Sequence, residues 1–137
     1  VVPGCMDFIW GHPDQTDRFK NRKTYRFNRS VWLGKLKGNE ISKAGQLMAK
    51  WINKSPENIT VILPLGGLSK YDKEGEEFYD PELDRTLFKV LKRSLDPKVR
   101  VVEADSHINE HEFARVCVVN LISLLSRKKN QSLNTTF

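Results

Sequence analysis

A short, almost wholly apolar segment at residues 59–65 is the feature that most constrains how this chain can fold. It is rich in β-branched residues and runs directly into a polar loop that begins with Gly66 and Gly67. This pattern is typical of a central strand in a parallel sheet whose two faces are covered by helices. A second strand is predicted at 99–103, one helix later, and it also runs out into a polar loop. The sequence therefore indicates strands and helices in alternation, joined by right-handed crossovers.

The predicted helices flank these strands. Apolar residues recur at helical spacing in three segments, 39–53, 81–95 and 109–125. Asp80 and Pro81 are typical of a helix start, because Asp caps the free N–H groups and Pro fits the first turn. Asn109 is predicted to cap the last helix. Upstream, residues 23–33 are predicted to form one or two strands.

The expected fold class is α/β: a three-layer Rossmann-like or flavodoxin-like domain with a mostly parallel sheet. A chain of 137 residues fits one such domain, which we place at residues 1–127, followed by a flexible polar tail at 128–137. The last helix is apolar nearly all round. We therefore expect it to be buried on more than one side or to form a homo-oligomer.

Composition limits the classes of function. No apolar run approaches the roughly 18 residues that cross a bilayer, so no membrane partner is expected. The two cysteines lie far apart and form no metal or redox spacing, which favours a reducing, cytoplasmic location. The sequence contains no nucleophile elbow and no spacing of metal ligands.

The net charge of +6 is unevenly distributed along the chain. Residues 18–37 hold eight basic residues and no acidic one, interleaved with Tyr25, Phe27 and Trp32. Such a run is able to bind phosphate groups, as in proteins that bind single-stranded RNA. The same alternation describes a half-buried strand with a solvated edge, and this interpretation is the more favoured of the two.

Residues with chemical ability gather in the two loops that follow the predicted strands. Gly66 and Gly67 would let a phosphate approach main-chain N–H groups, with Ser69 and Asp72 close by for a ribose or a metal-bound water. A tight turn explains the same glycines equally well. If the cradle is real, a side chain at Gly67 is expected to block the ligand with little harm to the fold.

His107 follows the second predicted strand. It is either a general acid or base, with Asp72 or Asp7 as its partner, or a residue that only fixes its own loop. Because the carboxyl ends of parallel strands meet at one edge of a sheet, His107 and the Gly66-Gly67 loop are predicted to lie side by side at that edge.

Several ordered motifs together resemble one protein family. They are Pro3-Gly4-x-x-Asp7, Asn28, Leu63-Pro64-x-Gly66-Gly67-x-Ser69-x-x-Asp72-x-x-Gly75, Phe78-Tyr79-Asp80-Pro81-Glu82 and His107-Ile108-Asn109-x-x-x-Phe113-Ala114. Over about residues 1–125 the chain resembles the two-domain ATP-binding family that includes the tomato mosaic virus resistance protein. The resemblance implies that the chain is the second half of a larger protein, whose N-terminal half is a Rossmann-like domain that this sequence does not include. It also implies ATP with magnesium as the cofactor.

Three functions follow from these observations. The leading hypothesis is a domain that binds a nucleotide or another phosphorylated small molecule, through Gly4, Asp7, Asn28, Gly66, Gly67, Ser69, Asp72, His107 and Asn109. The alternatives are an enzyme of unknown reaction that uses His107 as acid or base, and a protein- or RNA-interaction module that uses residues 18–37. If the loop residues converge on one pocket, the hypothesis of a domain that binds a phosphorylated small molecule is favoured.

Overall fold

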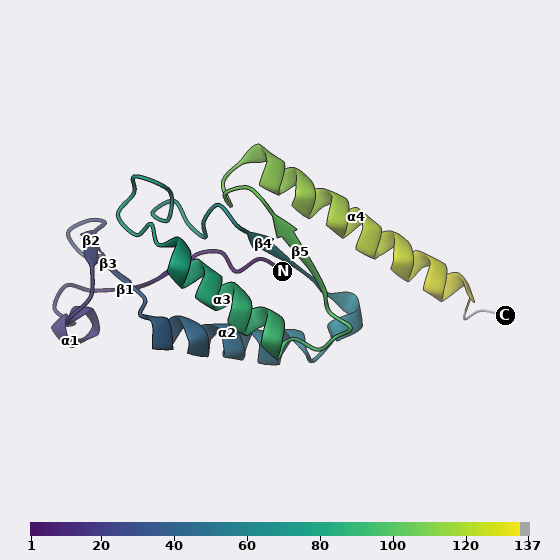
Figure 1. Ribbon diagram of the computed structural model, residues 1–137, viewed down its shortest axis with the longest axis horizontal. Helices are drawn as coiled ribbons and strands as arrows, with labels where there is room; N and C mark the ends of the chain where they lie inside the picture. Colours follow the sequence, from purple (N-terminus) through teal and green to yellow (C-terminus); the bar gives the residue numbers. More distant parts are fainter. Residues whose placement is uncertain (135–137) are drawn as a thin grey trace.

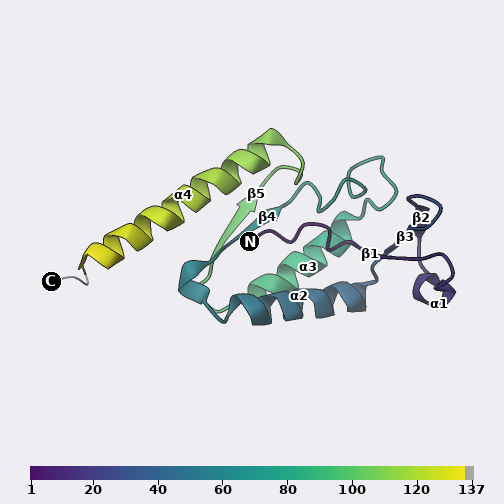
Figure 2. The same cartoon turned by 180° about the vertical axis from the view of Figure 1, so that it is seen from behind.

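The computed structural model describes the backbone of residues 1–134 and the side chains of residues 1–127. Figure 1 shows a layered α/β body with a small extension at one end, and Figure 2 shows it from behind. The elements in chain order are β1 (Phe8–Gly11), α1 (Thr16–Phe19), β2 (Thr24–Arg26), β3 (Trp32–Lys35), α2 (Gly38–Ile52), a 3-10 turn (Pro56–Asn58), β4 (Thr60–Pro64), α3 (Pro81–Ser94), β5 (Arg100–Ala104) and α4 (His111–Asn134).

The two strands predicted from their apolar runs are present and parallel. β4 pairs with β5 in register from Thr60 opposite Arg100 to Pro64 opposite Ala104. Val1 lies along the other edge of β4, because the Ile62 N–H donates to the Val1 carbonyl at 2.9 Å. The predicted order of strand, helix, strand and helix is therefore confirmed over residues 60–134.

Helices cover both faces of the parallel pair, and each face has its own core. Val61 and Leu63 point into the larger core, which α2 and α3 complete with Ile41, Ala49, Ile52, Leu83, Leu87, Phe88 and Leu91. Ile62 and Ala104 point to the opposite face, where they meet Phe113 of α4. Period-two alternation along β4 thus decides which helix packs against which side.

The sheet is not mostly parallel, and this corrects the predicted fold class. β1, β3 and β2 form a separate antiparallel sheet in that order, and the parallel sheet contains β4 and β5 alone among the described residues. The turn between β2 and β3 spans residues 27–31. A connection of that length joins antiparallel neighbours, whereas a parallel pair needs a crossover of about a dozen residues or more.

The last helix differs from its prediction at both ends. α4 begins at His111 instead of using Asn109 as its cap, and it continues to Asn134 past the expected end at Arg127. Residues 135–137 of the predicted tail lie outside the described residues. Among the α4 side chains up to Arg127, which the structure describes, five large apolar ones are more than half exposed, namely Val118, Val119, Leu121, Ile122 and Leu125. None of the helices in the described part of the chain has the length and apolarity to cross a membrane.

Candidate functional site

The loops that follow β4 and β5 interlock at one edge of the parallel sheet, as the sequence predicted. The Gly66 N–H donates to the Ser106 carbonyl at 3.1 Å, and the Ile108 N–H donates to the Gly67 carbonyl at 3.2 Å. Both loops leave the carboxyl ends of their strands, which lie side by side in the parallel pair. Backbone bonds therefore join the two loops before any side chain is considered.

Gly66 and Gly67 leave no room for a side chain, because the backbone of His107 and of Asp72 passes close to them. A Cβ at Gly66 would lie 2.6 Å from the His107 nitrogen, and one at Gly67 would lie 1.9 Å from the Asp72 carbonyl oxygen. Gly67 also has φ +127°, which other residues rarely adopt. The expectation that a side chain at Gly67 would do little harm to the fold is therefore wrong.

The N–H groups of this loop are already used inside the protein. The Gly67 N–H donates to the Pro64 carbonyl at 3.3 Å, and the Leu68 N–H donates to Asp72 Oδ2 at 2.8 Å. With the Gly66 N–H bonded to Ser106, three consecutive donors point inward. A phosphate would have to break these bonds to be held by this loop.

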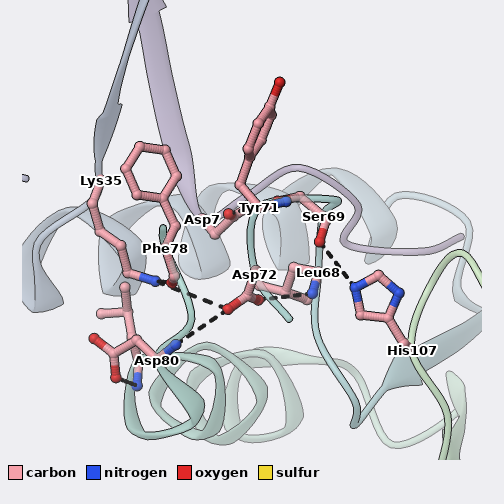
Figure 3. Close-up of polar contacts among 10 residues, drawn as sticks. Asp7, Lys35, Leu68, Ser69, Tyr71, Asp72, Phe78, Asp80 and His107 are labelled. Atoms are coloured by element: carbon pink, nitrogen blue, oxygen red, sulfur yellow. Dashed lines mark hydrogen bonds and ion pairs between the residues drawn. The ribbon is translucent and has the colours of Figure 1, made fainter. Parts of the chain in front are cut away.

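His107 fixes the two loops through both of its ring nitrogens. Nδ1 accepts the Asn109 N–H at 3.2 Å, so the ring proton is on Nε2, which donates to the Ser69 carbonyl at 2.9 Å. The ring is buried, with 4% of the residue exposed. Figure 3 shows the ring pointing at Ser69. In this arrangement neither nitrogen is free to act as an acid or base, and the loop-fixing interpretation fits the contacts.

Asp72 is the centre of a buried polar cluster, which we call the Asp72 hub and define as Asp7, Lys35, Ser69, Asp72 and Asp84. Asp72 Oδ2 accepts the Leu68 N–H, and Oδ1 accepts the Asp80 N–H at 3.3 Å. The carboxylate thus joins the start of the loop to the residue that caps α3 (Figure 3).

A lysine from another sheet reaches into this cluster. Lys35 Nζ from β3 lies 4.0 Å from Asp72 Oδ1 and donates to the Phe78 carbonyl. The residue is 9% exposed, so its ammonium group has little access to water. The ion pair and the hydrogen bond together attach the antiparallel sheet to the loop after β4.

Two further carboxyl groups face the same centre. Ser69 Oγ donates to Asp7 Oδ2 at 2.8 Å, while Asp7 Oδ1 has no hydrogen-bond partner. Burial raises the pKa of Asp7 to about 6, against the lowering effect of the Ser69 hydroxyl. Burial, followed by the negative charge of Asp72, raises the pKa of Asp84 on α3 to about 8. The hub therefore holds carboxyl groups that titrate near neutral pH.

The other predicted site residues do not join the hub. Asn28 lies on the exposed turn after β2, where its Oδ1 accepts the Ser30 and Val31 N–H groups at 2.8 and 2.7 Å. Asn109 is exposed beside His107. Gly4 is a packing position, since a Cβ there would lie 2.8 Å from Ile108 Cδ1.

Sequence reasoning missed Lys35 and Asp84. Asp84 carried a usable signal, because it lies among Leu83, Leu87 and Leu91 on the buried side of α3. An acid at an apolar position of a helix requires a buried partner. Lys35 carried no such signal, since its inward direction depends on the pairing of β3. Among the described residues, no group of three His, Cys, Asp or Glu side chains is placed to hold a metal ion.

A hollow of about 580 Å³ lies between β1 and α1. It is lined by Phe8, Ile9, Trp10, Gly11, His12, Gln15 and Arg18. Trp10 lines the hollow and is 68% exposed. Phe8 directly follows Asp7 and packs edge-on against Tyr71, with ring centroids 6.0 Å apart. The hollow thus adjoins the loop that carries the hub.

The basic run from 18 to 37 is divided between the interior and the surface. Arg22 donates to both carboxylate oxygens of Glu40 at 3.0 and 2.8 Å, and Lys35 is buried. Lys23 pairs with Glu77 at 3.5 Å. The favoured interpretation of a half-buried strand with a solvated edge is therefore incomplete, since Arg22 and Lys35 make their contacts inside the fold.

Fold and site together define a class: an α/β domain in which a buried acidic cluster joins a parallel strand pair to a small antiparallel sheet. The chain belongs to the family described as "Uncharacterised protein family (UPF0261) C-terminal domain", whose model matches residues 1–125. The family link expected from the sequence motifs is thereby confirmed, while its two-domain organisation and ATP binding stay predictions.

Individual relatives come from bacteria and plants. The UPF0261 protein of Clostridium tetani is 33% identical over 130 residues, which cover 93% of this chain and 32% of the relative. The ToMV resistance protein Tm-1(GCR237) of Solanum lycopersicum is 30% identical over 131 residues, covering 93% of this chain and 17% of the relative. The chain therefore spans about a third of the bacterial relative and less than a fifth of the tomato one.

Proposed function

We propose that this domain binds a nucleotide or a similar phosphorylated compound with a planar ring, in the hollow between β1 and α1. The observation that carries the proposal is Trp10, 68% exposed, in a hollow that also contains Arg18. An indole face stacks on a nucleobase, and a guanidinium group binds phosphate with two parallel hydrogen bonds. The hollow, at about 580 Å³, has the volume of small-molecule sites.

We do not place the ligand at Gly66 and Gly67. The N–H groups of that loop donate to Ser106, Pro64 and Asp72. The Asp72 hub behind it contains three carboxyl groups and one ammonium group, which disfavours an anion. The hollow offers Arg18 instead, with Gln15 as a further polar group.

Magnesium would enter this site with the nucleotide. Mg²⁺ is commonly held by substrate phosphates and water together with one or two carboxylates. The described residues contain no preformed group of metal ligands. We therefore expect ADP and ATP to bind both with and without Mg²⁺. The change in affinity on adding Mg²⁺ should be smaller than the change caused by Trp10→Ala.

The test is a calorimetric titration with ADP and ATP of the parent, Trp10→Ala and Arg18→Ala. Loss of one base stack weakens binding by about 1–3 kcal/mol, which is roughly 5- to 150-fold. Trp51→Ala is the matched control, because Trp51 is 60% exposed and lies on α2. Equal affinities of the Trp10 and Trp51 variants, or a parent that binds neither nucleotide, would contradict the proposal.

Single-stranded RNA is a second candidate ligand, and one observation favours it. Phe27 is 57% exposed in the turn after β2, between Arg26 and Arg29. Arg29→Ala is expected to weaken binding of a short oligonucleotide and to leave ADP binding unchanged, since Arg29 does not line the hollow. A parent that binds no oligonucleotide at low salt would exclude this candidate.

A further inference from the structure

A groove lined by apolar side chains lies between α2 and the segment that precedes β1. Its volume is about 540 Å³. We call it the α2 groove, and its lining includes Met6, Ala44, Leu47, Met48, Trp51 and Ile59. Leu47 is 47% exposed and Trp51 is 60% exposed, so the groove is open to solvent. Both methionines of the chain lie in this lining, and methionine side chains adjust their shape to a bound surface. Open apolar surfaces of this kind mark sites of interaction.

A second exposed apolar surface lies on α4. The side of this helix that faces the sheet is buried through Phe113, with Val116 and Cys117 packed against the same core. Away from that side, four large apolar residues are each more than half exposed, and we call them the α4 stripe: Val118, Leu121, Ile122 and Leu125. They follow one another at i, i+3, i+4 and i+7. This is the spacing at which an amphipathic helix fills the apolar groove of a partner.

The α2 groove and the α4 stripe cannot meet within one molecule. α2 packs in the core on one face of the parallel strand pair, and α4 packs on the opposite face. Figures 1 and 2 show α2 and α4 on opposite sides of β4 and β5. A contact between the two surfaces therefore requires a second copy of the chain.

The charges beside the two surfaces have opposite signs. Lys43 and Lys50 lie one helical turn before and after Leu47, so they border the α2 groove, and both are exposed. Glu110 and Glu112 are exposed at the start of α4, where they precede the α4 stripe. Opposite charges at the edge of an apolar contact attract the partners and set their orientation. The charges therefore favour α4 as the occupant of the groove, with its first turn near the lysines.

We propose that two copies of the chain associate by placing the α4 stripe of one copy in the α2 groove of the other, with Ile122 in contact with Leu47 and Trp51. One contact of this kind buries both exposed apolar surfaces, whereas pairing of two α4 helices would leave the groove open. The groove and the stripe are different surfaces, so the contact is heterologous. Made in both directions between two copies it closes a dimer, and made in one direction it extends into longer assemblies.

The test is sedimentation velocity over a range of concentrations, with the parent and two variants that each change one surface. Leu47→Asp places a charge in the α2 groove, and Ile122→Asp places one in the α4 stripe. The two side chains are 47% and 58% exposed, so the fold is expected to persist, which melting followed by circular dichroism checks. Each variant is expected to weaken self-association at least about tenfold, because each buries an unpaired charge in the contact.

Gln46→Asp is the matched control for the added charge. Gln46 is exposed on α2 next to Leu47, but it does not line the groove, so this variant should associate like the parent. A loss as large for Gln46→Asp as for Leu47→Asp would contradict the groove as the site of contact.

Mixing the two surface variants distinguishes the proposed contact from pairing of two α4 helices. Leu47→Asp keeps an intact α4 stripe and Ile122→Asp keeps an intact α2 groove, so the mixture should associate although neither variant does so alone. If α4 paired with α4, Leu47→Asp would associate like the parent. That result, a mixture that stays monomeric, or a parent that is monomeric at every concentration would overturn the proposal.

The exposed rim decides the matter if Leu47→Asp or Ile122→Asp does not fold. The double variant Lys43→Glu/Lys50→Glu leaves the apolar residues in place and puts acidic groups against the acidic start of α4. It should weaken self-association several-fold at low salt. An association equal to that of the parent would overturn the proposal.

Discussion

Replacing Gly67 by alanine tests the close approach of the two loops. The new Cβ would lie 1.9 Å from the Asp72 carbonyl oxygen and 2.9 Å from His107 Cδ2, so the backbone of the loop has to move. Overpacking of a filled site costs about 1–3 kcal/mol. The φ of +127° adds strain of about 1–3 kcal/mol. The sum, about 2–6 kcal/mol, is a large part of the roughly 5–15 kcal/mol that stabilises a typical domain.

Two other glycines separate the contributions to this loss. Gly75 has φ +88° with nothing within 4 Å of a built Cβ, so Gly75→Ala should show the strain alone. Gly38 has the same open surroundings without a positive φ and lies at the start of α2. Gly38→Ala should be neutral or stabilising by up to about 1 kcal/mol. The assay is urea unfolding of the three variants, and a Gly67→Ala loss no larger than that of Gly75→Ala would refute the close approach.

Three other changes have defined outcomes. Asp80→Ala removes the cap that accepts the Leu83 N–H at 3.0 Å. It should lower the free energy of unfolding in urea by about 1 kcal/mol, and an unchanged midpoint would contradict this. Glu40→Gln weakens the bidentate pair with Arg22 by about 1 kcal/mol at pH 7. Because Arg22 lowers the pKa of Glu40, the difference in unfolding free energy between the parent and Glu40→Gln should disappear as pH falls below 4.5. A difference of the same size at acid pH would argue against the pair. Ile122→Glu, at a side chain that is 58% exposed on α4, should dissociate any homo-oligomer in light scattering, whereas a monomeric parent would remove the expectation of self-association.

The parallel half of the fold was predictable because its signals are local. The segment at 59–65 has apolar side chains on both faces of the strand, and β4 is buried at every residue. Asp80 and Pro81 marked the start of α3 correctly, and the side chain of Asp80 is the observed cap. Parallel topology then placed the two polar loops together without any knowledge of side-chain contacts.

The antiparallel sheet was less predictable because its strands are short and depend on distant residues. β1 has four residues and lies between glycines and prolines, so its apolar period is too short to detect. Phe8 is held by Tyr71 and Phe78, more than sixty residues along the chain. The rest of the sequence was needed to decide that this segment is a strand.

The contact between the loops after β4 and β5 was predictable, but the roles of their polar residues were not. Ser69, Asp72 and His107 are together, yet their side chains bond to backbone groups and to Asp7. A sequence shows that a serine or histidine is present, and only the geometry shows whether its bonds are already made. Trp10 and Arg18 were not singled out as a pair because the hollow between them exists only after α1 folds over β1.

The most direct measurement is nuclear magnetic resonance of the ¹⁵N-labelled chain during titration with ADP. The Trp10 indole and the Arg18 side chain line the hollow, whereas the Gly66 and Gly67 amides are bonded inside the protein. We expect the Trp10 indole and Arg18 signals to shift first, and the two glycine amides to remain in place. A titration in which the Gly66 and Gly67 amides shift while the Trp10 indole is unmoved would contradict the account and restore the glycine loop as the ligand site.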